Sequence, residues 1–192
     1  SLARERRAAL SLTGDGAVLT QRLVVLEAVT GAAPILGPGL RVTLDDARGE
    51  RAGGGADPRQ GEDAEDGRVL DYDLQRLVNA LWESGAEAVS VNGQRVTALT
   101  AIRLAGEAIV VGYRPLAPPY VVDAIGDPAA LEPALADSAG GRYLRGLVKN
   151  YGIGLEVAPR RRLELPAAAG LRLTAARALP REDAATGQRE AR

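Results

Sequence analysis

Four polar side chains lie close together in the sequence and have the chemistry of a binding site. They are Asn79, Asn92, Gln94 and Arg95. Amide groups donate and accept hydrogen bonds, and a guanidinium donates them in a fixed fork. If the fold brings the four side chains together near the turn at Asn92, they can line a polar pocket for a small ligand or a glycan.

The reactive side chains that most enzymes use are missing from the sequence. The chain has no Cys and no His, which removes thiol nucleophiles, the usual general base and most zinc sites. No stretch has the alternating carboxylates of a calcium loop, and the GxG runs complete no nucleotide-binding motif. Catalysis by carboxylates alone would need an ordered pair, for which Glu83, Glu87 and Asp123 are candidates, but each is more simply a surface charge. We therefore predict no catalytic residue, no metal site and no cofactor.

The composition limits the classes of protein to which the chain can belong. It has 192 residues, of which 46% are hydrophobic and 3% aromatic, and its net charge is −1. That length suits one domain with appendages, and the core must be packed with aliphatic side chains. Because the chain has no overall positive charge, we predict no nucleic-acid partner.

A helix over Asp71–Ser84 is the clearest element that positions the candidate site. Its apolar residues recur with helical spacing at Leu74, Leu77, Val78, Leu81 and Trp82. The pattern predicts a helix that buries one face, with Trp82 as a core anchor and a binding platform as the alternative role of this residue. Asn79 lies at the border of that face. We interpret it as a structural amide bonded within the fold, with a ligand contact as the alternative.

A turn follows this helix, at the end of the sequence "GAEAVSVNGQR". Asn-Gly between extended segments is typical of a type I′ hairpin, whose two central residues need positive φ. That requirement explains Asn92 and Gly93 without any function. Arg95 is interpreted as paired with a carboxylate of the preceding helix, Asp71 or Asp73, with anion binding as the alternative.

The predicted helices have recognisable ends. Asp71 or Asp73 is suited to cap the start of the first helix, and Gly85 suits its end. A second helix begins with Asp127 as its N-cap and Pro128 as its first residue. These signals fix where the strands between the helices must begin and end.

Strands and helices alternate along the rest of the chain. Strands are expected at Leu40–Leu44, Glu87–Val91, Thr100–Leu104, Glu107–Tyr113, Tyr120–Ile125, Ile153–Pro159 and Arg161–Leu165, and a further helix at Gly141–Asn150. The last two strands are expected to form a hairpin turned at Pro159-Arg160. The order predicts a ferredoxin-like β-α-β-β-α-β sandwich of the α+β class, with extra strands and N-terminal helices. Both helices would cover one face of its antiparallel sheet, and the other face would be solvated, covered by the N-terminal helices or used by a partner.

The chain divides into three parts on composition. Residues 1–35 have a loose helical pattern, which fits either the end of a coiled coil or a helix packed on the domain, and residues 36–166 carry the α+β domain. Within that domain, residues 47–68 are acidic and Gly-rich, which predicts a flexible loop. Residues 167–192 have little pattern and are expected to be a disordered tail.

Three segments resemble a known bacterial family. They are "DLQRLVNALWESGAEAVSVNGQRV", "LGPGLRVTLDD" and "PPYVVDAIGDPAAL". In this order they are similar to the motifs of domain of unknown function 881, whose members are sometimes labelled division initiation proteins. The resemblance covers Leu36 to Pro166. Val89 and Val91 stand where the family pattern has Ile, and the acidic loop is longer than in the pattern.

The resemblance implies a single-pass membrane protein with a coiled-coil stretch and an extracytoplasmic α+β domain. Because the sequence begins at Ser1 rather than at Met, we expect the membrane anchor to precede this fragment. The family has no established catalytic residues. The expected function is therefore a non-enzymatic interaction domain of the cell envelope, linked to cell division or cell-wall assembly, with a protein partner or a second copy as its ligand. The alternative is a small-ligand or glycan-binding module that uses a polar pocket near the Asn92-Gly93 hairpin.

Overall fold

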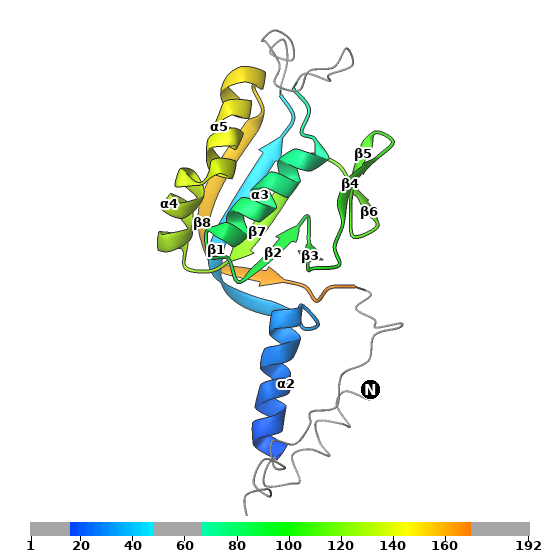
Figure 1. Ribbon diagram of the computed structural model, residues 1–192, viewed down its shortest axis with the longest axis vertical. Coiled ribbons are helices and arrows are strands. Elements are labelled where there is room, and N and C mark those ends of the chain that lie inside the picture. The colour runs from blue at the N-terminus through cyan, green and yellow to red at the C-terminus, as the bar shows by residue number, and fades with distance from the viewer. Residues whose placement is uncertain (1–15, 48–66, 170–192) are drawn as a thin grey trace, which may run out of the picture.

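The computed structural model describes residues 16–47 and 67–169, which form an α+β unit with one helix extending from its end (Figure 1). The strands form two antiparallel sheets, so the predicted α+β class is confirmed. The predictions for residues 1–15, most of the acidic loop and the tail beyond residue 169 lie outside the described residues.

The larger sheet has five strands in the order β3-β2-β7-β1-β8. They are β1 (Ile35–Asp45), β2 (Ala88–Val91), β3 (Gln94–Val96), β7 (Tyr120–Ile125) and β8 (Gly154–Leu165). In β1 the side chains of Leu40, Val42 and Leu44 alternate with more exposed residues and are at most 1% exposed. This alternation is the predicted one, and it places the aliphatic core on one face of the sheet.

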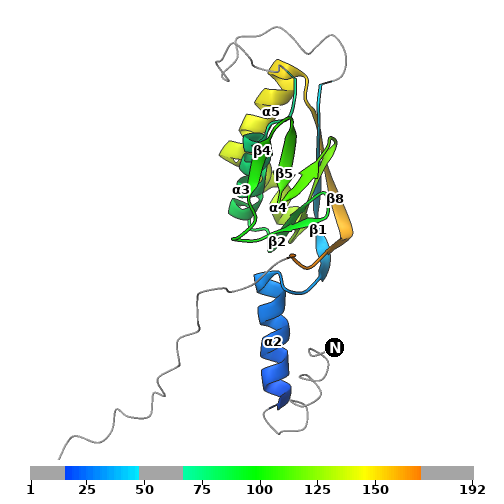
Figure 2. The ribbon, with the colours of Figure 1, turned by 90° about the vertical axis from the view of Figure 1, so that its right-hand side faces the viewer.

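Three described helices cover that face, as the view turned by 90° shows (Figure 2). They are α3 (Asp71–Glu83), α4 (Pro128–Asp137) and α5 (Ala139–Tyr151). On the other face of the sheet, a smaller cluster consists of Ile35, Ala88, Ile125, Leu163 and Leu165. The chain therefore covers part of this second face with the ends of its own β1 and β8.

The end of the sheet near β8 differs from the prediction. The two segments expected to form a hairpin at Pro159-Arg160 are one continuous strand, which pairs antiparallel with β1 along its length. The register between the two strands shifts between Gly37 and Gly39, so the ribbon bends where a turn was predicted. β8 pairs only with β1 among the described strands, and Pro159 is tolerated on such an edge strand.

The smaller sheet consists of β4 (Ile102–Ala105), β5 (Ala108–Val111) and β6 (Arg114–Leu116). The first two match the predicted extended segments, whereas β6 was missed because Pro115 lies in its centre. Side chains of α3 hold this sheet in place. The Gln75 amide donates to the Ile102 carbonyl at 2.8 Å, and the Asp71 carboxylate accepts the Leu104 N–H at 2.9 Å.

The start of α3 is capped differently from the prediction. Its N-cap residue is Leu70, not Asp71 or Asp73. Asp73, fully buried, instead reaches back to accept the Leu70 N–H at 2.8 Å, and it also accepts the Tyr143 hydroxyl at 2.7 Å. One carboxylate therefore satisfies the helix start and ties α3 to α5.

The other predicted helix ends are confirmed. Gly85 has a φ of +96° after the C-cap of α3. The Asp127 carboxylate accepts the Ala129 N–H at the start of α4, where Pro128 is the first helical residue. In strand β1, position 39 must be a glycine, because the Cβ of any other residue would overlap the carbonyl oxygen of Ala124 on the neighbouring strand β7.

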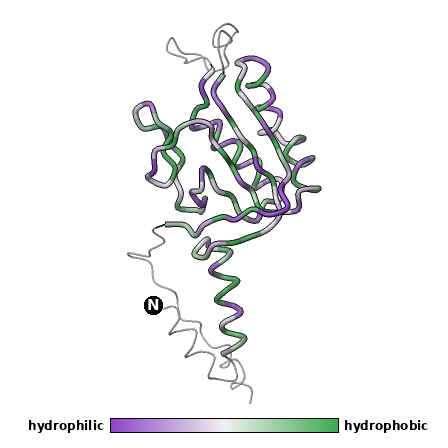
Figure 3. Tube along the Cα trace, turned by 180° about the vertical axis from the view of Figure 1, so that it is seen from behind, coloured by the Kyte–Doolittle hydropathy of each residue, from purple (hydrophilic) through white to green (hydrophobic). Residues whose placement is uncertain are grey.

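The helix α2 (Gly16–Thr30) extends away from the α+β unit. Coloured by hydropathy, it is largely hydrophobic along its length (Figure 3). Its exposed large apolar side chains are Val18, Leu19, Val24, Val25, Leu26 and Val29. Nothing in the described part of the chain covers these side chains.

Candidate functional site

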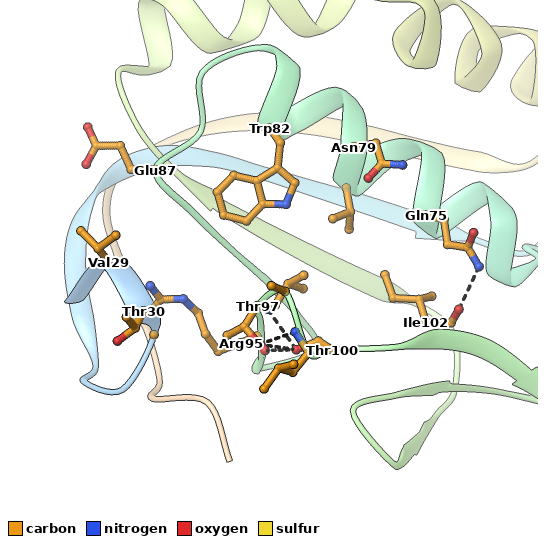
Figure 4. A pocket seen from close by; sticks show the side chains of 15 residues that line it. Val29, Thr30, Gln75, Asn79, Trp82, Glu87, Arg95, Thr97, Thr100 and Ile102 are labelled. Carbon is orange, nitrogen blue, oxygen red and sulfur yellow. Dashed lines mark hydrogen bonds between the residues drawn. The ribbon is translucent and has the colours of Figure 1, made fainter. Parts of the chain in front are cut away.

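A cleft of about 600 Å³ lies between α3, the last turn of α2 and the segment from β3 to β4 (Figure 4). The side chains that line it include Val29, Thr30, Gln75, Val78, Asn79, Trp82, Glu87, Arg95, Val96, Thr97, Leu99, Thr100 and Ile102. Two of the four predicted site residues, Asn79 and Arg95, are among them. The cleft has an apolar floor and polar side chains at several points, as ligand sites commonly do.

Trp82 points from α3 into this cleft (Figure 4) and is 38% exposed. The prediction that it anchors the core was therefore wrong. Successive residues of a helix are turned by about 100° around its axis. Leu81, which is fully buried, takes the core position, and its neighbour Trp82 is turned to the edge of the buried face.

Asn79 lies one turn before Trp82 on the same side of α3 and is exposed. Its side-chain amide makes no hydrogen bond to any residue that the structure describes, and neither does the indole N–H of Trp82. The interpretation of Asn79 as a structural amide was therefore wrong for the described fold. Gln75, one turn earlier, does play such a role through the β4 carbonyl described above.

Arg95 is the buried charge of the site, with 5% of its surface exposed. Its Nη2 donates to the Ala28 carbonyl at 3.0 Å, and its Nη1 donates to the Pro166 carbonyl at 3.5 Å. The expected pairing with Asp71 or Asp73 is not formed, because both carboxylates bind backbone N–H groups elsewhere.

The electrostatics of Arg95 follow from this position. Burial lowers the pKa of the Arg95 guanidinium from its usual value, yet an arginine stays charged in proteins. The carbonyl of Ala28 belongs to the last turn of α2, where the helix dipole is negative. A hydrogen bond from the Ala168 N–H to the Gly31 carbonyl, at 2.8 Å, joins the same end of α2 to the segment after β8. Arg95 therefore links α2 to the α+β unit.

Asn92 is occupied by the fold. Asn92 and Gly93 have φ values of 43° and 72°, which confirms the predicted turn conformation. The Asn92 Oδ1 accepts the Val121 N–H at 2.6 Å, and its Nδ2 donates to the carbonyls of Ala117 and Pro119 at 3.4 and 3.3 Å. The side chain thus fastens the hairpin to the start of β7, and it does not line the cleft.

Gln94 lies on the other side of Arg95. It lines a smaller hollow of about 230 Å³ with Arg95, Thr100, Arg114 and residues 166–169. The four predicted site residues are therefore divided: Asn79 and Arg95 share the cleft, Gln94 lies next to it, and Asn92 is structural.

The sequence did not indicate Thr97 and Thr100 as residues of the cleft, and it gave Trp82 a binding role only as the alternative to core anchoring. The two threonine hydroxyls are 3.2 Å apart, and the Thr100 hydroxyl also donates to the Arg95 carbonyl at 3.3 Å. Helical spacing could have indicated part of the site, because Gln75, Asn79 and Trp82 recur at i, i+4 and i+7 on one side of α3.

The carboxylates considered for catalysis do not meet in the cleft. Asp123 forms a two-point ion pair with Arg41, at 2.7 and 2.9 Å, between neighbouring strands β1 and β7. The hydrogen bond to Asp123 raises the pKa of Arg41. Glu83 is exposed, and of the three candidates only Glu87 lines the cleft. Among residues 16–47 and 67–169, no three His, Cys, Asp or Glu side chains are grouped as a metal site would require.

Over the described ranges, no helix has both the length and the apolar character needed to cross a membrane.

Comparisons with known proteins place the chain among bacterial proteins without a described activity. It is 41% identical over 170 residues to UPF0749 protein Rv1823 of Mycobacterium tuberculosis (strain ATCC 25618 / H37Rv), which covers 85% of this chain and 53% of the relative. It is 37% identical over 111 residues to UPF0749 protein YlxW of Bacillus subtilis (strain 168), which covers 58% of this chain and 44% of the relative. The chain thus spans about half the length of the curated relatives it matches.

A solved structure and a family model also match. The fold is similar to the crystal structure of an uncharacterized conserved protein from Mycobacterium tuberculosis, with a TM-score of 0.60 and 26% identity, over 82% of this chain and 99% of that one. The family model described as "Bacterial protein of unknown function (DUF881)" matches residues 22–177. The chain therefore belongs to the DUF881 family.

Proposed function

We propose that the protein is a non-enzymatic interaction domain that pairs with a second copy of itself through α2. The observation that carries this proposal is the uncovered apolar surface of α2, where Leu26 is 58% and Val29 77% exposed. Large contiguous apolar surfaces on soluble proteins mark contact sites, because their exposure to water is unfavourable. α2 contacts the α+β unit at its last turn, and residues 16–47 and 67–169 leave the exposed apolar side chains along the rest of its length uncovered.

The spacing along α2 favours a parallel pair of helices. Leu19, Leu23 and Leu26 follow each other at intervals of four and three, which is the spacing of core positions in a coiled coil. In that register Arg22 and Glu27 take positions g and e, which lie five residues apart. Opposite charges with this spacing face each other across two parallel helices in register. A second copy of this chain therefore supplies both the apolar seam and the complementary charges.

We also propose the arrangement that the family resemblance implies. The α+β unit would lie outside the cytoplasm, carried by a membrane anchor N-terminal to α2, as part of an envelope protein linked to cell division or cell-wall assembly. A ferredoxin-like unit is supported by the strand order β2-β7-β1-β8, with α3 following β1 and the pair α4 and α5 following β7. Fusing reporters that are active on one side of the membrane only to the full-length protein would test the topology.

A second candidate function is a small-ligand or glycan-binding module. It is favoured by one observation, that Asn79 and Arg95 line the same cleft. The Asn92-Gly93 turn does not contribute to that cleft, since the Asn92 amide is bonded to the start of β7. If this candidate holds, its pocket is on the α3 side of Arg95.

The pairing of α2 is tested by sedimentation of the chain and of two matched variants. Leu26→Asp places a charge in the proposed seam, whereas Val24→Asp places the same charge on another side of α2, and both residues are exposed, at 58% and 44%. We expect a dimer for the parent chain and for Val24→Asp, and a monomer for Leu26→Asp. A monomeric parent chain at micromolar concentration, or equal effects of the two variants, would overturn the proposal.

A further inference from the structure

We infer that the cleft beside Trp82 binds a short, uncharged, β-linked oligosaccharide. This inference rests on the second candidate function above and gives it a location and a ligand class. It is independent of pairing through α2.

The first observation is the exposed indole of Trp82, which forms one wall of the cleft (Figure 4). A tryptophan exposes a flat ring whose face carries partial negative charge. The axial C–H groups of a pyranose carry partial positive charge and form a flat apolar face of similar size. β-Linked pyranoses present such faces along an extended ribbon, so they stack on a planar ring better than the curved chains of α-linked glucose.

The second observation is the set of unused polar groups next to that ring. The Asn79 amide and the Trp82 indole N–H make no hydrogen bond within residues 16–47 and 67–169. The amide both donates and accepts, as sugar hydroxyl groups do. Thr97 and Thr100 also line the cleft, but their hydroxyl groups are already bonded to each other and to nearby backbone groups, so the unused groups are those of Asn79 and Trp82.

The charges of the cleft favour an uncharged ligand. Glu87 and Arg95 are its two ionisable lining residues, and they have opposite charges. Arg95 is almost completely buried and its guanidinium donates to two backbone carbonyls. The cleft therefore offers an anion no exposed cation, while the balance of charges permits a neutral ligand.

The backbone around the cleft disfavours an extended peptide. A peptide that joins a sheet needs free N–H and carbonyl groups on an exposed strand edge. On β4 the Ile102 carbonyl and the Leu104 N–H are already bonded to Gln75 and Asp71. Beside β3 the Arg95 carbonyl is bonded to the Thr100 hydroxyl. These three backbone groups are therefore not available to pair with a peptide strand, which favours recognition through side chains.

The dimensions of the cleft agree with this class of ligand. Its volume of about 600 Å³ falls within the roughly 300–1,000 Å³ of small-molecule sites. Its floor is apolar where Val78, Val96 and Ile102 approach it, which suits the C–H faces of a sugar.

The test uses Trp82 as a built-in probe, because it is the only tryptophan of the 192 residues. The whole chain is titrated with cellotriose and with triacetylchitotriose, and with maltotriose as the α-linked comparison, while Trp82 fluorescence and heat of binding are recorded. We expect a saturable response to at least one β-linked trisaccharide at millimolar concentration or below, and at least tenfold weaker binding of maltotriose. Raising the salt concentration should leave the affinity unchanged.

Matched variants assign the response to the cleft. Trp82→Ala and Asn79→Ala should each weaken binding by about tenfold in calorimetry, as expected for loss of a stacked ring or a good hydrogen bond. Tyr113→Ala and Asn150→Ala remove an exposed aromatic residue and an exposed amide elsewhere, and should have no effect. Leu26→Asp should bind equally well, which separates this inference from α2 pairing.

Four results would overturn the inference. They are no response to either β-linked trisaccharide, equal binding of maltotriose, binding that survives both cleft variants, and a response to inorganic phosphate or to an extended apolar peptide in place of the sugars.

Discussion

The helices α2 and α3 are both rich in aliphatic residues, but of the two only α3 buries them against other parts of residues 16–47 and 67–169. Leu74, Leu77 and Leu81 of α3 are fully buried against the sheet, whereas Leu26 and Val29 of α2 are more than half exposed. The difference lies in how the apolar residues are arranged. In α3 they follow one side of the helix and match one face of a sheet, and in α2 they are spread around most of it.

The comparison teaches that hydrophobicity alone does not tell where a helix will pack. The one-sided pattern of α3 specifies a neighbour within the fold, the sheet against which its leucine side chains are buried. The pattern of α2 specifies no such neighbour, and Arg95 holds the helix to the unit by its last turn. The apolar surface of α2 is thus available for a contact between molecules.

Replacing one leucine by alanine in each helix should give the largest difference in the free energy of unfolding between α3 and α2. Leu77→Ala removes a fully buried side chain from α3 and should lower the free energy of unfolding by about 3 kcal/mol. Leu26→Ala in α2 should change it by less than about 0.5 kcal/mol when measured on monomer, because the side chain is exposed. Urea denaturation of the parent chain and both variants at high dilution, where α2 is unpaired, checks this. Equal losses would show that α2 is part of the same core.

Removing the buried carboxylate at the start of α3 should give the second largest loss in the free energy of unfolding. Asp73→Ala removes the carboxylate that accepts the Leu70 N–H and the Tyr143 hydroxyl, and should lower the free energy of unfolding by about 2 kcal/mol. Asp71→Ala, which loses a partly exposed carboxylate bonded to the edge of β4, serves as the control and should cost less. If the two variants are equally stable, the buried carboxylate does not hold α3 to α5.

Breaking the link that Arg95 forms between α2 and the α+β unit should give a smaller and more local loss of stability. Arg95→Met removes two hydrogen bonds, to Ala28 and Pro166, but keeps an aliphatic side chain in the buried position. Hydrogen exchange should become faster at residues 26–31 and 166–169, by roughly tenfold for a local loss of about 1–2 kcal/mol. Exchange in α3 should stay unchanged. Faster exchange across the whole sheet would instead mean that Arg95 supports the core.

The parts of the fold that depend on local patterns could be predicted from the sequence. The helical period gave α3, alternation gave β1 and β7, and the Asn-Gly pair gave the turn at Asn92. β8 could not be predicted as one strand, because Pro159 and the arginines after it are typical of a turn. The pairing with β1, whose paired residues lie 109 (Asp45 with Gly154) to 130 (Ile35 with Leu165) positions earlier in the chain, decides its conformation.

The candidate site was predictable only in part for the same reason. The partners of Arg95 are backbone carbonyls 67 and 71 residues away, and no side-chain pattern marks a carbonyl as a partner. Asn79 was placed at the border of the buried face of α3, whereas Trp82 was expected in the core and is 38% exposed. Whether a border position is covered depends on the neighbouring elements, and here α2 and the segment after β3 leave it open as a cleft.

The most direct test of the central proposal is disulfide formation across α2. The natural chain has no Cys, so a Leu26→Cys variant carries a single thiol in the proposed seam, and Val24→Cys carries one outside it. Two parallel helices in register bring the same core position of both copies within the reach of a disulfide. Under mild oxidation we predict rapid formation of a covalent dimer for Leu26→Cys and little for Val24→Cys. Equal crosslinking of the two variants, or none for Leu26→Cys, would contradict parallel pairing through α2.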